Sequence, residues 1–327
     1  MEGLSNFLSS IGQEVEDADE ESFLLFSQDI PSSNLGFVDS KAATLDITIH
    51  NQDYAIHQSP TLLSSSRAGG TTGAVLWKIT PLFAEWISNT SNSLWTNSIL
   101  TPSSTVVELG CGISGLTALA LSHRIGHYLA TDQEYVHRLF RQNLDSNPPQ
   151  SQRQQAPSKS KGRKQQQQQQ QQQKSRSSKS TPTEQTNGHP HPNITFTSLD
   201  WELDNPATLR QQIPTTTSTA TQERGEDDEE PAGSDKGFDV LLSCDCIYNE
   251  SLIAPFVRTC AEICNLRPGA RPTVCIIAQQ QRSPDVFEAW LRETMRWFRV
   301  WRVGADALGG KLGGGSGYLV HMLVLRG

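Results

Sequence analysis

The chain has 327 residues, of which 35% are hydrophobic and 19% are charged, so it is long for one domain but poor in apolar side chains for two full cores. Its formal net charge of −8 is weak evidence against an extended nucleic-acid-binding surface. No window approaches the roughly 20 apolar residues that span a bilayer, and the N-terminus lacks the basic and then apolar residues of a secretion signal. We therefore expect no membrane partner and a soluble, cytoplasmic protein. A nuclear location is the alternative.

Three segments have compositions that disfavour a packed core. Residues 1–35 hold eight acidic side chains and no Lys or Arg, residues 148–192 surround an unbroken Gln run, and residues 210–236 are Thr-rich and then acidic. We therefore expect a disordered, acidic N-terminal segment over residues 1–42 and two disordered inserts. The inserts would interrupt one domain that spans residues 43–327.

The remaining chain consists of apolar segments with strand or helix periodicity. The expected strands are 43–56, 105–109, 128–131, 194–199, 238–243, 273–278, 300–303 and 318–325, and the expected helices are 74–88, 116–124, 134–143, 252–266 and 286–298. Alternating strands and helices predict right-handed crossovers and a parallel sheet that is covered on both faces. The last two strands are joined by a Gly-rich loop without a helical pattern, so they should pair antiparallel.

The predicted fold class is therefore α/β. It is a doubly wound, mostly parallel sheet of seven strands, beginning with the strand at residues 105–109 and closed by an antiparallel C-terminal hairpin. This architecture is typical of methyltransferases that use S-adenosylmethionine.

A glycine-rich loop lies at residues 106–115, between the first strand of this sheet and the helix that follows it. It contains Gly110, Cys111 and Gly112, and glycines at this spacing allow a tight turn and let a ligand approach the backbone. The same spacing is the fingerprint of dinucleotide-binding proteins. Glu108, two residues before the first glycine, would repel a pyrophosphate but attract a cationic ligand such as S-adenosylmethionine. A nicotinamide-dependent oxidoreductase and a glycine turn without a ligand are the alternatives.

Asp132 ends the next predicted strand, 24 residues after Glu108. A carboxylate at that place can accept hydrogen bonds from both ribose hydroxyls of either cofactor. Both acids stand at the carboxyl ends of strands, where open α/β sheets bind ligands. We therefore expect Glu108 and Asp132 to belong to one cofactor site.

Two further motifs follow the third and fourth strands of the sheet. They are Leu199-Asp200-Trp201 and Cys244-Asp245-Cys246-Ile247-Tyr248. Together with the glycine loop, they resemble the seven-β-strand protein lysine methyltransferases of the methyltransferase-like 21 type, which carry a DxxY element after the fourth strand. The resemblance covers roughly residues 43–147, 192–209 and 237–327. It implies a Rossmann-like class I methyltransferase domain, S-adenosyl-L-methionine as the cofactor and a lysine side chain of a protein as the substrate.

The resemblance also implies roles for individual residues. Trp201 would stack near the adenine, Cys244 would line the cofactor, and Trp77 would reach the cofactor from upstream of the glycine loop. Asp245 would attract the incoming lysine, and Tyr248 would wall the lysine channel. Ordinary core packing is the alternative for the three aromatic residues, and a helix N-cap is the alternative for Asp245.

The resemblance favours a lysine of a large-subunit ribosomal protein as the substrate, with an elongation factor or a chaperone as the alternative. A protein that binds the cofactor without turnover is a further alternative.

Residues 279–282, Gln-Gln-Gln-Arg, should lie at the rim of the same site or form an exposed polar loop. RNA contact is expected only through the basic residues 159–164, which otherwise are a solvated linker. The six cysteines show no CxxC pair, so we expect reduced core thiols and no metal, with a metal site at Cys260 and Cys264 on one helix face as the alternative. We also expect a monomer.

Overall fold

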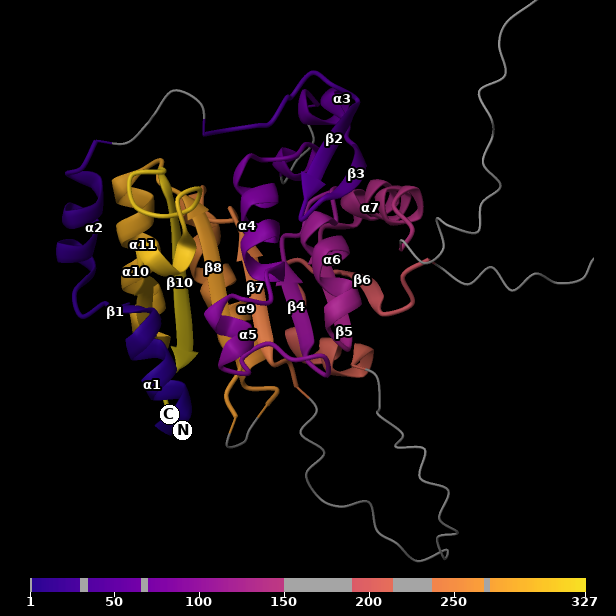
Figure 1. Cartoon of the computed structure of the whole chain (residues 1–327). Coiled ribbons are helices and arrows are strands. Elements are labelled where there is room, and N and C mark those ends of the chain that lie inside the picture. Colours follow the sequence, from indigo (N-terminus) through magenta and orange to yellow (C-terminus); the bar gives the residue numbers. More distant parts are fainter. Residues whose placement is uncertain (1, 30–34, 66–69, 150–189, 214–236, 268–270) are drawn as a thin grey trace, which may run out of the picture.

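The computed structural model describes residues 2–29, 35–65, 70–149, 190–213, 237–267 and 271–327. One sheet with the strand order β1-β9-β10-β8-β7-β4-β5-β6 runs through the centre of the molecule (Figure 1). Most of the two inserts, including the basic residues 159–164, lies outside the described residues.

One side of the sheet, from β8 to the edge strand β6, is parallel, and the other side is antiparallel. The parallel strands are β8 (Val274–Gln280), β7 (Val240–Cys244), β4 (Thr105–Leu109), β5 (His127–Asp132) and β6 (Ile194–Ser198). β10 (Tyr318–Leu325) lies antiparallel between β8 and β9 (Phe298–Val303). β4, β7 and β8 are largely apolar runs because helices cover both of their faces. The predicted mostly parallel sheet with an antiparallel C-terminal hairpin is thereby confirmed.

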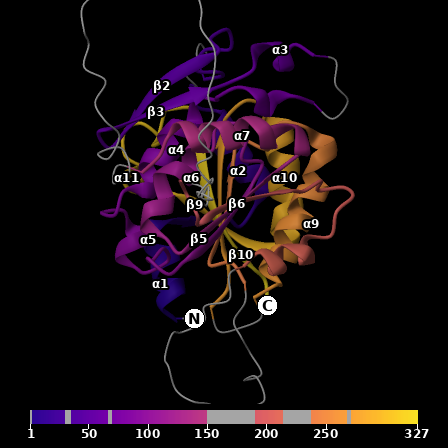
Figure 2. The ribbon, with the colours of Figure 1, turned by 90° about the vertical axis from the view of Figure 1, so that its right-hand side faces the viewer.

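Helices lie on both faces of this sheet, as the view along the sheet in Figure 2 shows. Val106 of β4 belongs to the core under one helical layer and the next residue, Val107, to the core under the other. The first layer contains α4 (Ile79–Ser88), α6 (Leu116–Leu121) and α7 (Glu134–Ser146), and the second contains α9 (Ile253–Cys264) and α10 (Pro284–Trp297). Shorter helices are α3 (Pro60–Leu63), α5 (Ser93–Thr96), α11 (Ala305–Leu308), η1 (Thr72–Ala74), η2 (Ser122–Arg124), η3 (Pro206–Gln212) and η4 (Glu250–Leu252).

The N-terminal segment is part of the folded domain, so the prediction of a disordered segment over residues 1–42 is wrong for residues 2–29 and 35–42. α1 (Glu2–Ile11) and α2 (Ala18–Phe26) flank β1 (Gly12–Glu14), which pairs antiparallel with β9 and makes the sheet eight-stranded rather than seven-stranded. α1 buries Phe7, Leu8 and Ile11 in the core on one face of the sheet. Residues 15–25 bury apolar side chains on the other face, so the segment wraps around this edge of the sheet (Figure 1).

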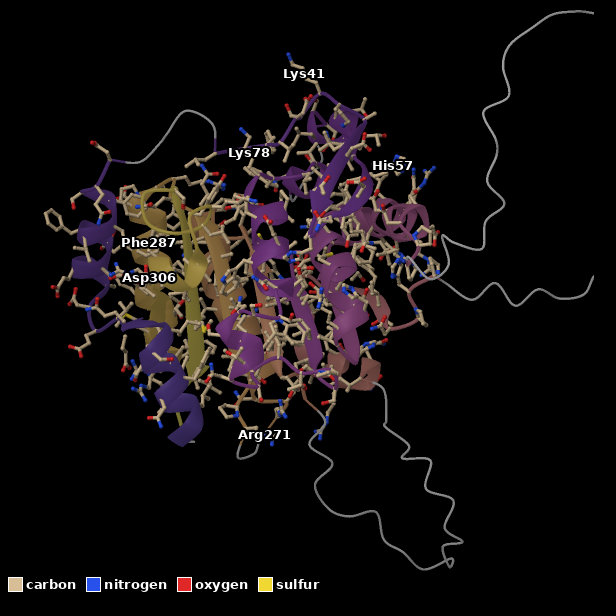
Figure 3. The ribbon with its side chains drawn as sticks, viewed as in Figure 1. Lys41, His57, Lys78, Arg271, Phe287 and Asp306 are labelled. Atoms are coloured by element: carbon tan, nitrogen blue, oxygen red, sulfur yellow. The ribbon has the colours of Figure 1, made fainter. Side chains whose placement is uncertain are left out.

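Acidic side chains of this segment pair with arginines near the C-terminus of the chain. Glu14 binds the Arg299 guanidinium through both carboxylate oxygens, each at 2.7 Å. Glu21, 8% exposed, lies 3.0 Å from Arg302. The ring of Phe26 packs 5.6 Å from that of Phe287 on α10 (Figure 3). The acidic composition that suggested disorder is therefore complementary to a basic edge of the sheet.

Phe7→Ala is expected to lower the free energy of unfolding by about 3 kcal/mol, because it removes a large side chain that is 3% exposed and leaves a cavity. Phe23→Ala on α2 is the matched control, since Phe23 is 76% exposed and its loss should change the free energy of unfolding by less than about 0.5 kcal/mol. Urea denaturation of the two variants measures both values. Equal, small effects would show that the N-terminal segment does not stabilise the domain.

Three other elements differ from their predicted form. Residues 43–56 form a hairpin of two strands, β2 (Thr44–Ile49) and β3 (Gln52–His57), because His50 and Asn51 adopt the left-handed conformation of a tight turn. α4 begins only at Ile79, so Trp77 lies outside the helix that was predicted over residues 74–88. The loop between β9 and β10 contains the one-turn helix α11, which is too short to show helical periodicity in the sequence.

The described residues on either side of the first insert contact each other. His191 is 7% exposed, and its Nε2 donates a hydrogen bond to the carbonyl oxygen of Asn147 at 2.7 Å. Asn147 in turn binds the backbone of β3 through its side-chain amide. Asn147 and His191, on either side of residues 150–189, therefore lie side by side.

Candidate functional site

A cavity of about 480 Å³ lies at the carboxyl ends of β4, β5, β6 and β7, at the upper end of these strands in Figure 1. Parallel strands place their carboxyl ends at the same edge of a sheet, which brings loops from distant parts of the sequence together. The residues that were predicted as catalytic or cofactor-binding all line this cavity: Trp77, Glu108, Gly110, Cys111, Gly112, Asp132, Trp201, Cys244, Asp245 and Tyr248.

The glycine loop requires glycine at its first positions. Gly110 and Gly112 have φ values of 68° and 61°, in the left-handed region that other residues rarely adopt. A Cβ on Gly110 would also lie 2.3 Å from the sulfur of Cys246 and 3.5 Å from the ring of Trp201. The loop can therefore pass close to the cavity only because these positions have no side chain.

The backbone N–H groups of residues 110–113 are engaged within the protein. Two of them donate to the carbonyl oxygen of Thr131, at 2.9 and 3.1 Å. The next donates to Asp132 Oδ2 at 2.8 Å, and the last to the carbonyl oxygen of Gly73 at 3.0 Å. Binding of a pyrophosphate at such a loop depends on N–H groups that point at the ligand. This arrangement therefore disfavours a dinucleotide at the loop.

Two carboxylates at the cavity have raised pKa values. Glu108 is 2% exposed, and its Oε2 accepts a hydrogen bond from the Tyr128 hydroxyl at 2.7 Å. Burial raises the pKa of Glu108 from 4.5 to about 7, and loss of hydration raises the pKa of Asp132 from 3.8 to about 6. A nearby positive charge would stabilise both carboxylates in their ionised form. The cavity is therefore suited to a cationic ligand.

Glu108→Gln is expected to raise the free energy of unfolding of the ligand-free protein at pH 8 by up to about 3 kcal/mol. The pKa of Glu108 is higher in the folded chain than its ordinary value of 4.5, so the native state holds this proton to higher pH. Its contribution to stability is most favourable below about pH 4.5, falls as the pH rises to about 7, and is constant above that. Urea denaturation of both proteins from pH 4.5 to 8 measures the difference, and a difference that does not grow with pH would contradict the raised pKa.

The segment upstream of the glycine loop closes the mouth of the cavity. The hydroxyl of Thr72 donates to the hydroxyl oxygen of Tyr248 at 3.2 Å, and the indole N–H of Trp77 donates to the carbonyl oxygen of Thr72 at 3.1 Å. The ring of Phe37, from the N-terminal segment, lies 4.3 Å from the Trp77 ring. Tyr248 is 36% exposed, which excludes ordinary core packing for this residue. Trp77 and Tyr248 thus reach the cavity from separate parts of the chain, and Phe37 contacts Trp77 from a third.

Trp201 forms the opposite wall. Its ring meets the Phe256 ring edge-on at 5.1 Å, and its carbonyl oxygen accepts a hydrogen bond from Arg258 at 2.8 Å. Trp201 therefore packs on α9 and lines the cavity at the same time. Core packing and a place beside the cofactor, the two roles considered from the sequence, are thus compatible.

Asp245 is held in a strained, buried position. Its φ is 61° and the residue is 8% exposed. Oδ1 accepts a hydrogen bond from the backbone N–H of Gln280 at 3.1 Å, and Oδ2 accepts one from the Arg282 guanidinium at 2.6 Å. Burial raises the pKa of Asp245, and Arg282 opposes that rise. The N-cap interpretation is wrong, because the Asn249 side chain caps the helical segment that leads into α9.

Several residues at the site were not identified from the sequence. Gly73, Thr72 and Tyr135 line the cavity, but they lie in segments without a motif. Arg282 was expected only as part of a polar rim, and the structure pairs it with Asp245. The arginine two residues after the end of β8 was a signal, but only the fold shows which acid it meets.

Some features are not found in the part of the chain that the structure describes. Among those residues, no group of three or more His, Cys, Asp or Glu side chains could hold a metal ion. None of the helices in the described ranges has the length and apolar character that a membrane span requires. The six cysteines are present as free thiols.

The sequence is similar to several fungal proteins. It is 28% identical over 257 residues to ribosomal lysine N-methyltransferase 5 of Zygosaccharomyces rouxii, covering 74% of this chain and 70% of that protein. It is 26% identical over 316 residues to the Candida glabrata protein of the same name, covering 81% and 84%. The predicted resemblance to protein lysine methyltransferases is thereby confirmed. No protein-family model matches the chain.

A further relative has a different name. The chain is 27% identical over 290 residues to a diaminohydroxyphosphoribosylamino-pyrimidine deaminase of Schizosaccharomyces pombe. The match covers 88% of this chain but only 53% of that protein, so the chain spans about half the length of this relative. Among solved structures, a putative S-adenosylmethionine-dependent methyltransferase from Streptococcus mutans matches 87% of this chain and 56% of its own, with a TM-score of 0.41 and 10% identity.

Proposed function

We propose that this protein transfers a methyl group from S-adenosyl-L-methionine to a lysine side chain of a ribosomal protein. The observation that carries the proposal is that one cavity joins the glycine loop and two carboxylates, Glu108 and Asp132, to the buried Asp245 and the more exposed Tyr248. One part of the cavity fits a cationic nucleoside, and the other fits an incoming cationic side chain. The fungal relatives named ribosomal lysine N-methyltransferase 5 support the class of substrate.

The chemistry of the cavity wall supports the cofactor. The N–H groups of residues 110–113 are engaged within the protein, and two carboxylates with raised pKa values lie beside them. This combination disfavours a pyrophosphate and favours a ligand with positive groups and no phosphate. S-adenosylmethionine supplies an activated methyl group on a cationic sulfur. Asp132 would accept hydrogen bonds from the ribose hydroxyls, Trp201 would lie along the adenine, and Trp77, Cys111 and Cys244 would complete the wall.

The residues at the mouth would position the amine. Methyl transfer to nitrogen requires a neutral amine in line with the bond that breaks, so orientation provides most of the rate. A free lysine has a pKa of about 10.4, and desolvation beside a cation favours loss of its proton to water. Asp245 would attract the ammonium group and then hold the amine by a hydrogen bond. Tyr248, at the exposed end of the cavity, would limit the access of water.

The name of the S. pombe relative raises deamination as a second candidate. Zinc-dependent deaminases of nucleobases bind their metal through a His-x-Glu and a Cys-x-x-Cys element. The cysteines of this chain lie at positions 111, 244, 246, 260, 264 and 275, and none of them forms a Cys-x-x-Cys pair. The chain therefore lacks these zinc ligands, and the match to about half of that relative does not support a deaminase.

Two measurements test the proposed function. Calorimetric titration with S-adenosylhomocysteine should show binding, whereas NAD should not bind. Ribosomes from cells that lack the enzyme should then accept labelled methyl groups, and mass spectrometry should locate them on a lysine of a large-subunit protein. Elongation factors and chaperones from the same cells are assayed in parallel. Methyl transfer to only one of these would show that it, rather than a ribosomal protein, is the substrate. Binding of NAD alone would contradict the methyltransferase.

We also propose that the protein acts as a monomer in the cytoplasm and touches RNA only through residues 159–164, which lie outside the described part of the chain. Light scattering during gel filtration tests the monomer. Salt-dependent binding to rRNA that disappears when the Lys and Arg residues of this stretch become Ser tests the RNA contact.

A further inference from the structure

Arg282 occupies the cation-binding side of Asp245. Its Nη2 lies 2.6 Å from Asp245 Oδ2 and 2.9 Å from the side-chain oxygen of Gln280. The same guanidinium lies over the Trp77 ring, 5.0 Å from its centroid. The Asp245 side chain is 2% exposed and that of Arg282 is 24% exposed. Arg282 thus reaches from the solvent-facing rim to a nearly inaccessible carboxylate.

A carboxylate beside an aromatic face is a common arrangement for the recognition of cationic side chains. In Asp245, Oδ1 already accepts a hydrogen bond from the backbone of Gln280, so Oδ2 is the oxygen that faces a cation. Arg282 binds this oxygen and covers Trp77, so the chain provides its own cation at this position. An ammonium group and the guanidinium cannot both occupy it without strong repulsion between like charges.

We propose that Arg282 is a resident cation, which fills the lysine position against Asp245 and Trp77 in the substrate-free protein and is displaced when the substrate lysine enters. This inference rests on the proposed function. Without Arg282, the substrate-free protein would hold a buried, unpaired carboxylate, which is strongly unfavourable. With Arg282, the carboxylate stays paired both before and after the lysine binds.

Displacement of Arg282 would set the binding free energy that a substrate must supply. A short amine gains only the contacts inside the channel, which are similar to those that Arg282 already makes. A protein substrate gains additional contacts outside the channel, and these can drive the exchange of one cation for the other. Arg282 would therefore weaken the binding of every amine by the same factor, so that free amines and short peptides bind poorly and only a substrate with additional contacts binds well.

The test is steady-state methylation by wild type, Arg282→Gln, Arg282→Lys and Arg296→Gln, with the protein substrate and with a short lysine peptide from it. If Arg282 is displaced, Arg282→Gln should lower the KM of both substrates about tenfold and leave kcat within about twofold. The substrate lysine would then no longer compete with the Arg282 guanidinium for Asp245. Arg282→Lys keeps a cation and should remain close to wild type. Arg296, 73% exposed and paired with Glu293 on α10, controls for the loss of one positive charge far from the cavity.

A higher KM or a kcat that falls tenfold or more in Arg282→Gln would overturn the proposal, since Arg282 would then hold Asp245 in place or bind the substrate directly. The same lowered KM in Arg296→Gln would also overturn it, because the effect would be one of net charge. Calorimetry with S-adenosylhomocysteine shows whether each variant is folded and binds cofactor. An inactive wild type overturns the proposed function, and this inference with it, whereas an active wild type with a weaker-binding Arg282→Gln variant overturns this inference alone.

Discussion

Asp245→Asn is expected to reduce single-turnover methylation of the protein substrate about a hundredfold and to change the affinity for S-adenosylhomocysteine less than about twofold. Asp245 lines the same cavity as the glycine loop, and in the proposed function the methyl group meets the amine beside it. Asparagine keeps the shape and tolerates the left-handed φ of 61°, so the backbone should be preserved. It removes the negative charge that attracts the ammonium group, so the rate of methyl transfer should fall while the affinity for the cofactor stays nearly unchanged.

Tyr248 provides the matched pair of variants for the same channel. Tyr248→Phe keeps the ring and loses only the hydroxyl that accepts a hydrogen bond from Thr72, so it should lower turnover a few-fold, whereas Tyr248→Ala opens the channel to water and should lower it about a hundredfold. Calorimetry and single-turnover assays are made on the same preparations. Full activity of Asp245→Asn and Tyr248→Ala, with intact cofactor binding, would show that the DxxY element is structural in this protein.

Asp132→Ala is expected to weaken binding of S-adenosylhomocysteine by about 1.5 to 3 kcal/mol, which is the loss of charge-assisted hydrogen bonds to the ribose. The structure adds a second reason. Asp132 Oδ2 also accepts the N–H of Gly112 at 2.8 Å, so its removal loosens the glycine loop as well. Asp132→Asn keeps one acceptor oxygen and should lose less affinity than Asp132→Ala.

Calorimetry on folded variants measures this effect, and Asp306→Ala is the control for loss of one negative charge, because Asp306 is exposed on α11 (Figure 3). Affinity in Asp132→Ala equal to that of wild type would remove Asp132 from the cofactor site. An equal loss in Asp306→Ala would show that the effect comes from net charge rather than from contact.

The parallel core of the fold and the glycine loop could be predicted from the sequence because both depend on short-range physics. Val106 and Val107 face opposite cores, and this alternation within one continuous apolar run is a direct consequence of strand geometry. Gly110 and Gly112 mark a turn that other residues cannot adopt, whatever surrounds it. The acids at the ends of β4 and β5 follow from the topology, since parallel strands end at one edge.

The N-terminal segment was decided only by the tertiary structure. Its acidic composition is typical of disorder when it is considered alone. Glu14 and Glu21 are stabilised by Arg299 and Arg302, which are more than 280 residues away in the chain. Local periodicity and composition do not show which distant charges will pair in the fold. β1 is also too short to show a strand pattern.

The same reason applies to the mouth of the site. The sequence by itself determined which residues stand at strand ends, including Asp245 after β7 and Arg282 after β8. Only the packing of these two strands side by side brings the guanidinium to the buried carboxylate and over Trp77. The contact depends on side-chain direction and burial across three distant segments, and these are set when the strands pair and the core excludes water.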